Sequence, residues 1–298
     1  MRVRVEELFT ARPATGLGSR ALRFPPLRIP VCLLFLLLFL VPHNTLIADF
    51  LASATGMMRT VLSLADSAVS LVILLLLYRL YVHWAEGREA VEVGTDGALG
   101  EFGRGFLISL GIVGFMVLTM ALAGFYRLGS VASPGILLEA FFHFGIGAFV
   151  QVLLFRAVLF RLTEESLGTW TALVVVAAIF GLAHLANENA TLWNSVGLLL
   201  ADVLLAAAFI YTRRLWMAFG IHTGWNFIQD GVFGLPNSGL TELPSWITPV
   251  VQGPTWVTGG SFGIEASPVQ VLLSVGIGLL ILRRAWAEDQ FVSPAWRR

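Results

Sequence analysis

The stretch Thr169–Glu188, TWTALVVVAAIFGLAHLANE, decides the fold class of this chain. It is 20 residues long and carries one charge, at its end, and this is the length of a helix that crosses a bilayer. Similar apolar stretches recur along the 298 residues, so the mean hydropathy is +0.81 and only 13% of the residues are charged. A soluble domain carries about 25% charged residues. The sequence therefore predicts an all-α, polytopic membrane helix bundle.

Eight stretches have the length and composition of spanning helices. They are Leu27–Leu46, Val61–Trp84, Phe106–Tyr126, Ile136–Leu162, Thr169–Glu188, Trp193–Thr212, Leu215–Phe233 and Pro268–Leu282. The predicted organisation is a cytoplasmic N-terminal segment, residues 1–26, then a transmembrane helical domain, residues 27–284, and then a cytoplasmic tail, residues 285–298.

The arginines predict the orientation, because cytoplasmic loops of membrane proteins are enriched in Lys and Arg. The chain has 19 basic residues, all of them arginine. With the N-terminus inside, eight spans leave only Arg59 and Arg127 on the outer side. We therefore expect an integral membrane protein with both termini in the cytoplasm.

Polar side chains within the apolar stretches are candidate functional residues, because they are costly in hydrocarbon. His222 and Asn226 are four residues apart and share one helix face. Gln151, His184 and His222 are all expected near the membrane midplane, facing the bundle interior or a wet cavity. Taken alone, each is more often a hydrogen-bond partner between helices, and Arg156 alone is more often a snorkelling arginine. The joint pattern favours a functional site.

Three short motifs carry a resemblance to a known family. Residues 136–265 resemble the CPBP family of intramembrane proteases, which comprises the CAAX-protease-like and bacteriocin-processing, or Abi, proteins. The family motifs, in order, are Glu-Glu-x-x-x-Arg, Phe-x-x-x-His and His-x-x-x-Asn. The segment around Arg156 resembles the first, Phe180–His184 the second and His222–Asn226 the third.

Two further segments agree with this resemblance. Residues 234–239 and 258–266 are similar to the segments that follow the third motif in many bacterial members. The resemblance implies an endopeptidase in a bacterial plasma membrane that acts on membrane-associated peptides or proteins.

The resemblance also implies roles for individual residues, with one departure. In the family the first glutamate is the general base, the histidines and the asparagine orient the attacking water and stabilise the oxyanion, and the arginine holds the local structure. Those roles carry over to His184, His222, Asn226 and Arg156. The glutamate pair, however, is replaced by Gln151-Val152, and a neutral amide cannot usefully accept a proton.

Two acidic residues are candidates for a substitute carboxylate. Asp202 lies in the middle of the sixth predicted span, where its alternative interpretation is a paired structural aspartate. Glu188 follows His184 by four residues on the same face, where its alternative interpretation is a solvated span end. Asp202 is the better hypothesis.

Two functions remain open from the sequence. One is an intramembrane endopeptidase with an unidentified base. The other is a catalytically inactive pseudo-protease that binds, shields or escorts a membrane client protein, and the chemistry at Gln151 favours it. A transporter or channel has no support, because neither broken helices nor paired repeats are evident.

The expected partners are the lipid bilayer and a peptide, membrane-protein substrate or client. The net charge of zero gives no sign of a nucleic-acid partner. We expect no cofactor. A divalent metal at His184 and His222 has little support, because a catalytic zinc site normally has three protein ligands, and the single cysteine, Cys32, cannot form a cysteine-based site.

Overall fold

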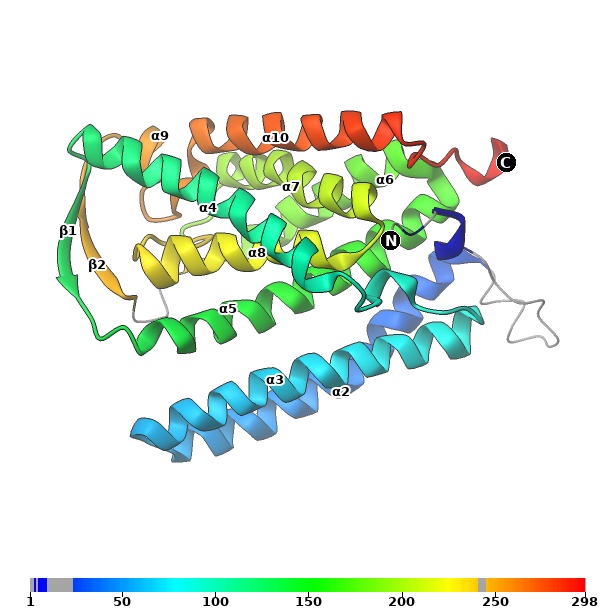
Figure 1. Cartoon of the computed structure of the whole chain (residues 1–298), viewed down its shortest axis with the longest axis horizontal. Helices are drawn as coiled ribbons and strands as arrows, with labels where there is room; N and C mark the ends of the chain where they lie inside the picture. The colour runs from blue at the N-terminus through cyan, green and yellow to red at the C-terminus, as the bar shows by residue number, and fades with distance from the viewer. Residues whose placement is uncertain (1–2, 4, 10–23, 241–244, 298) are drawn as a thin grey trace.

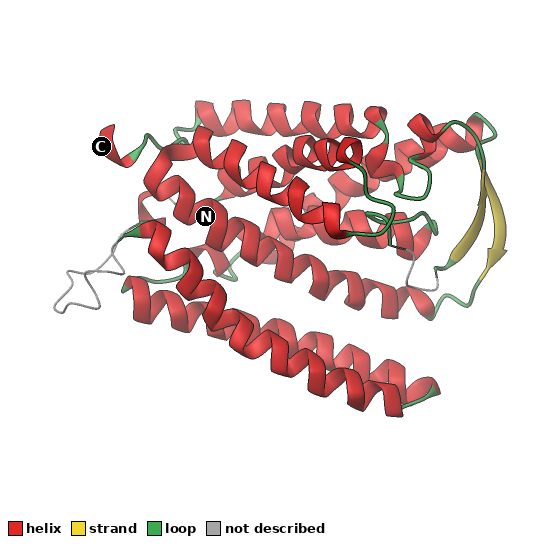
Figure 2. Ribbon diagram, turned by 180° about the vertical axis from the view of Figure 1, so that it is seen from behind, coloured by secondary structure: helices red, strands yellow, loops and turns green. Residues whose placement is uncertain are grey.

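The computed structural model describes residues 3, 5–9, 24–240 and 245–297. Most of the predicted N-terminal segment, residues 1–26, lies outside the described residues. The long helices in chain order are α2 (Pro25–Ser53), α3 (Gly56–Tyr81), α4 (Ala98–Leu122), α5 (Ile136–Val152), α6 (Arg161–Ala183), α7 (Leu192–Thr212), α8 (Leu215–Asn226) and α10 (Pro268–Ala287). Figures 1 and 2 show these helices side by side, which confirms an all-α membrane bundle.

Every predicted span contains a helix, but the helices are not all separate. Among the described residues, six helical runs are long and apolar enough to cross a membrane. The fourth and fifth predicted spans form one run, Ile136–Ala186, through the π-helical segment η4 (Leu153–Phe160). Gly168, with a φ of 78°, breaks this run into two passes. The seventh span is α8 continued by the π-helical segment η6 (Phe227–Val232), and α8 is too short to qualify alone.

Two short strands close one end of the bundle, and the sequence did not indicate them. β1 (Tyr126–Val131) pairs antiparallel with β2 (Ile247–Val251), with Tyr126 opposite Val251. The Tyr126 hydroxyl donates a hydrogen bond of 3.0 Å to the Phe233 carbonyl. The strands therefore tie the end of α4 to the end of the α8–η6 segment (Figure 1).

α8 is held in the centre of the bundle by close contact with α4. A Cβ atom on Gly220 would lie 2.0 Å from the Phe102 carbonyl oxygen, so the two backbones approach too closely for any side chain. Ser109 of α4 donates a hydrogen bond of 2.6 Å to the Ile221 carbonyl. Small residues and interhelical hydrogen bonds are the usual means by which membrane helices associate. These contacts fix the position of His222, the next residue along α8.

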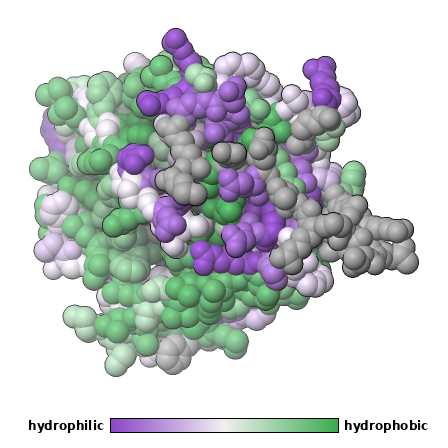
Figure 3. Space-filling model, turned by 45° about the vertical axis from the view of Figure 1, so that its right-hand side comes forward, coloured by the Kyte–Doolittle hydropathy of each residue, from purple (hydrophilic) through white to green (hydrophobic). Residues whose placement is uncertain are grey.

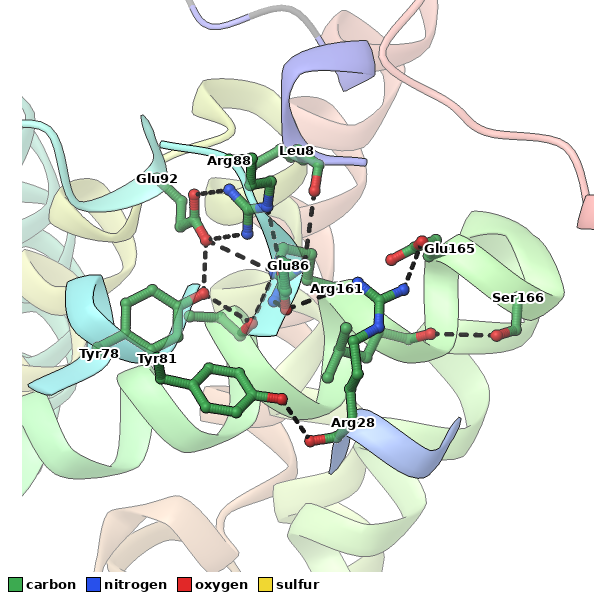
Figure 4. A network of polar contacts seen from close by, with 12 residues as sticks. Leu8, Arg28, Tyr78, Tyr81, Glu86, Arg88, Glu92, Arg161, Glu165 and Ser166 are labelled. Carbon is green, nitrogen blue, oxygen red and sulfur yellow. Dashed lines mark hydrogen bonds and ion pairs between the residues drawn. The ribbon is translucent and has the colours of Figure 1, made fainter. Parts of the chain in front are cut away.

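A buried polar network anchors the first two helices to the rest of the bundle (Figure 4). Arg161 of α6 is fully buried and donates to Glu86, at the end of the π-helical segment η2 (Val82–Glu86), at 2.6 Å. Arg88 donates to both carboxylate oxygens of Glu92, at 2.8 and 2.6 Å, and the Tyr78 hydroxyl of α3 donates to the same group at 2.5 Å. Burial alone raises the pKa of Glu92, but Arg88, Arg161 and the Tyr78 hydroxyl together outweigh it and hold that pKa at about 2.

Both described ends of the chain lie at the same end of the bundle (Figure 1). Hydrophilic side chains gather around that end, and hydrophobic side chains cover the flank formed by α2 and α3 (Figure 3). This distribution is typical of an integral membrane protein. The side of the membrane that the polar end faces stays a prediction, based on the arginines.

Candidate functional site

The second motif lies where α6 ends. His184 follows the last residue of α6, and its Nδ1 atom lies 2.7 Å from the Phe180 carbonyl oxygen. A carbonyl oxygen can only accept, so Nδ1 carries a proton and Nε2 of the neutral ring is left as an acceptor. The Phe180 ring packs between the motif histidines, with its centroid 4.5 Å from that of His184 and 6.4 Å from that of His222. The second and third motifs therefore meet around one aromatic ring.

The third motif occupies the last two turns of α8. His222 is buried, and Asn226 is the last α-helical residue before η6 begins. Short π-helical runs inside helices frequently occur at functional sites. Among the described residues, no group forms a hydrogen bond with His222 Nδ1. A buried polar atom of this kind normally binds water or a ligand.

A cavity of about 60 Å³ joins these motifs. A single buried water needs roughly 10 to 15 Å³ of such volume, so the cavity has space for a few waters. Its polar lining comes from the end of α6, from α7, α8, α10 and the loop before α10. The polar lining residues are His184, Asp202, His222, Asn226, Ser238, Glu265, Gln270 and Ser274, together with Trp225.

The first motif lies beside this cavity. Val152 is buried in the apolar core, and Gln151 is half-buried in the last turn of α5. The lining, as described above, includes neither of them nor Arg156. The position that holds the general base in the family therefore contributes no carboxylate to the cavity.

Arg156 has a carboxylate partner from another helix. It is 1% exposed, and its Nη2 atom donates to Asp202 Oδ1 of α7. This ion pair joins η4 to α7 inside the bundle. The interpretation of Arg156 as a snorkelling residue near the membrane surface is therefore wrong.

The two proposed substitute carboxylates have different surroundings. Asp202 lines the cavity, but Arg156 binds one of its oxygens. A close cation favours the charged form of a carboxylate and lowers its tendency to take a proton. Glu188 is exposed in the turn after His184 and is not among the residues that line the cavity. Of the two, only Asp202 is brought together with the motif residues.

The cavity contains a further carboxylate, Glu265, which no motif singles out. Glu265 is 4% exposed and lies in the short 3-10 helix η7 (Ile264–Ala266). Its Oε1 atom accepts a hydrogen bond of 3.1 Å from Trp225 Nε1, and its Oε2 atom accepts from the Ser238 backbone N–H at 2.5 Å and the Ser238 hydroxyl at 3.0 Å. Burial raises the pKa of Glu265 to about 7, although these hydrogen bonds oppose the shift.

The loop that carries Glu265 depends on its glycines. Gly263 has a φ of 109°, and a Cβ atom there would lie 2.0 Å from the Pro236 carbonyl oxygen, so only glycine fits. On the other side of the loop, Asn187 donates to the Ser238 carbonyl at 2.9 Å. Ser238 thus connects Glu265 to the segment that follows His184. The sequence signal for this arrangement is the pair of segments, residues 234–239 and 258–266, that carry Ser238 and Glu265.

The site offers few ligands for a metal. Among the described residues, no three His, Cys, Asp or Glu side chains lie close enough together to hold a metal ion. The polar groups around the cavity are two imidazoles, two amides, two serine hydroxyls, the Trp225 indole and two carboxylates, and Arg156 binds one of these carboxylates.

Comparison with known proteins agrees with the three motifs. The family model described as type II CAAX prenyl endopeptidase Rce1-like matches residues 132–228 of the 298-residue chain. No curated protein and no solved structure matches the chain. The matched region contains all three motif positions and ends just after Asn226, so it includes α5, α6, α7 and α8. Residues 132–228 of this membrane protein are therefore similar to the CPBP, or CAAX-protease-like, family.

Proposed function

We propose that the protein is an intramembrane endopeptidase that cleaves membrane-associated peptides or proteins. The observation that carries this proposal is the shared polar cavity, around which two separate helices bring His184, His222 and Asn226 together. A peptide bond is hydrolysed when a positioned water attacks its carbonyl carbon and donors stabilise the resulting oxyanion. The cavity has the volume for the water and the donors for the oxyanion.

Each motif residue has a role that follows from its hydrogen bonds. His184 Nε2 is free to accept a hydrogen bond from the attacking water, because the Phe180 carbonyl fixes the proton on Nδ1. The Asn226 amide and an N–H of His222 are the donors for the oxyanion. Arg156 and Asp202 hold η4 against α7 and act on structure. The site works in this proposal without a resident metal.

The second candidate is an inactive pseudo-protease that binds or escorts a membrane client. It is favoured by Gln151 and Val152, because neither can take a proton and neither lines the cavity. The two functions differ in one observable property, which is cleavage of a peptide.

The test is cleavage of internally quenched peptides of randomised sequence, anchored by a lipid chain in liposomes that contain the purified protein. We expect wild type to cleave, His222→Ala to lose cleavage, and His83→Ala to retain it, because His83 is an exposed histidine away from the cavity. If wild type does not cleave, the endopeptidase proposal is wrong. If Gln151→Glu, alone or with Val152→Glu, then creates cleavage, the protein is a pseudo-protease on an intact scaffold.

The orientation belongs to the same proposal. We propose that the polar end of the bundle, with both termini, faces the cytoplasm of a bacterial cell. The partners are then the bilayer and a substrate or client within it. Labelling of single cysteines introduced near Arg59 and near Arg283, in intact cells, tests this: only the cysteine near Arg59 should react with an impermeant reagent.

A further inference from the structure

We infer that Glu265 is the general base of this site, in place of the missing glutamate of the first motif. This inference rests on the proposed endopeptidase function. Glu265 enters the cavity from η7, a segment beyond the region that the family model matches. The carboxylate of the base would then come from the loop before α10 and not from α5.

The first argument is the shared cavity. Glu265, His184, His222 and Asn226 line one volume of about 60 Å³. A general base acts within hydrogen-bond reach of its proton, directly or through one water. Glu265 lines the space that a water would share with the motif residues, whereas Glu188 is exposed outside the cavity.

The second argument is the comparison of the carboxylates in the cavity. Asp202 is bound by Arg156, so a guanidinium compensates its charge and occupies one of its oxygens. Glu265 has only neutral donors, which are Trp225 and Ser238. Neutral donors hold the carboxylate in place without a compensating positive charge. Of these two carboxylates, Glu265 is therefore the one whose charge is not shared with an arginine.

The third argument concerns proton affinity near neutral pH. Burial raises the pKa of Glu265 to about 7, and a general base is most effective when its pKa lies near the working pH. The other titratable groups that line the cavity are His184 at the start of the 3-10 helix η5 (His184–Ala186), Asp202 on α7 and His222 on α8. Asp230 of η6 lies outside the lining and raises the pKa of Glu265 further through its charge.

The reaction balances with these groups alone. Glu265 takes a proton from the attacking water while the water oxygen forms a bond to the peptide carbonyl carbon. The oxyanion that results is held by Asn226 and His222. When the intermediate collapses, the C–N bond breaks and protonated Glu265 gives its proton to the leaving amine. The base is thereby regenerated and one water is consumed.

The test compares three variants with wild type in the liposome assay, with folding checked by thermal unfolding in detergent. Glu265→Gln keeps the shape of the side chain but cannot take a proton, and we expect cleavage to fall by about 10²- to 10⁴-fold with little change in folding. Glu265→Asp should recover part of the activity. Asp230→Asn is the matched control, because it removes a nearby carboxylate outside the cavity, and it should cleave within a few-fold of wild type.

The pH profile separates a catalytic role from a structural one. Wild-type cleavage should rise with pH through about 7, as Glu265 loses its proton. Ser238→Ala removes a hydrogen bond that favours the charged carboxylate, so the midpoint of this rise should move to higher pH. Asp230→Asn removes a like charge, so the midpoint should move to lower pH. If Glu265 only tied the loop together, neither variant would move the midpoint.

The outcomes distinguish the inference from the function on which it rests. If wild type cleaves, and folded Glu265→Gln cleaves within a few-fold of it, the inference about Glu265 is wrong and the endopeptidase function stands. If wild type does not cleave but Gln151→Glu does, Glu265 cannot act as a base and both proposals fail. If none of these proteins cleaves, hydrolysis is excluded and both proposals fail again.

Discussion

Removal of the Asp202 carboxylate should strongly destabilise the protein, because it leaves a buried guanidinium without a partner. Asp202 and Arg156 are 0% and 1% exposed at their side chains. Among the described residues, Nε and Nη1 of Arg156 have no hydrogen-bond partner, so the bond to Asp202 is the one that compensates the charge. Breaking a buried pair of this kind costs about 3 to 5 kcal/mol. That cost is roughly a 10²- to 10³-fold change, or more, in the unfolding equilibrium.

The assay is unfolding of the purified protein in mixed micelles with increasing SDS, applied to a double-mutant cycle. Asp202→Ala should lower the free energy of unfolding by the full amount. The double variant Arg156→Leu, Asp202→Ala should recover most of it, because no buried charge is left unpaired. If the losses in free energy of unfolding of Arg156→Leu and Asp202→Ala simply add in the double variant, the two side chains are not energetically coupled. The conclusion that their ion pair holds η4 against α7 is then wrong.

The same cycle examines the hypothesis that Asp202 is the base. Asp202→Asn keeps the shape of the side chain but removes its charge. We expect this variant to lose stability, and to lose cleavage only to the extent that it unfolds. Cleavage abolished in a fully folded Asp202→Asn protein would instead favour Asp202 over Glu265 as the base.

Three further predictions concern other parts of the molecule. Gly220→Ala should displace α8 and abolish cleavage, because the new Cβ atom would lie 2.0 Å from the Phe102 carbonyl oxygen. The control is Gly114→Ala, whose Cβ atom would meet no other atom within 4 Å, and it should change neither cleavage nor the free energy of unfolding. Glu92→Gln should lower the free energy of unfolding by about 2 to 3 kcal/mol near neutral pH, because Arg88 loses one of its two carboxylate partners and keeps only Glu86. The difference in free energy of unfolding between wild type and Glu92→Gln should shrink as pH falls from about 4.5 toward 2, since the pKa of Glu92 is depressed in the folded state. A difference that stayed constant across that range would contradict this. EDTA should leave cleavage unchanged, and loss of activity that Zn²⁺ restores would show that the two motif histidines hold a metal.

The membrane helices could be predicted because their signal is local. A run such as Thr169–Glu188 is apolar along its whole length, and a bilayer admits only fully hydrogen-bonded helices of this size. The break between the fourth and fifth spans also had a local signal at Gly168. The strands β1 and β2 had none, because each is short and is stabilised by a partner more than 100 residues away.

The motif residues could be predicted, but their partners could not. His184, His222 and Asn226 stand at fixed spacings on apolar helices, and a polar group at that depth must face the bundle interior. The pairing of Arg156 with Asp202 depends on how η4 packs against α7. No spacing in the sequence encodes that contact.

The sequence by itself therefore determined the fold class, the spanning segments and the three polar positions of the family motifs, because these follow from hydropathy and from spacing along single helices. Only the tertiary structure decided which carboxylates meet them. Asp202 and Glu265 reach the same cavity from α7 and from η7, respectively. Asp202 binds a buried guanidinium and forms a structural ion pair, whereas Glu265 accepts hydrogen bonds from neutral donors and is the candidate base. Proton affinity depends on burial and on neighbouring charges in space, and neither is a property of the sequence alone.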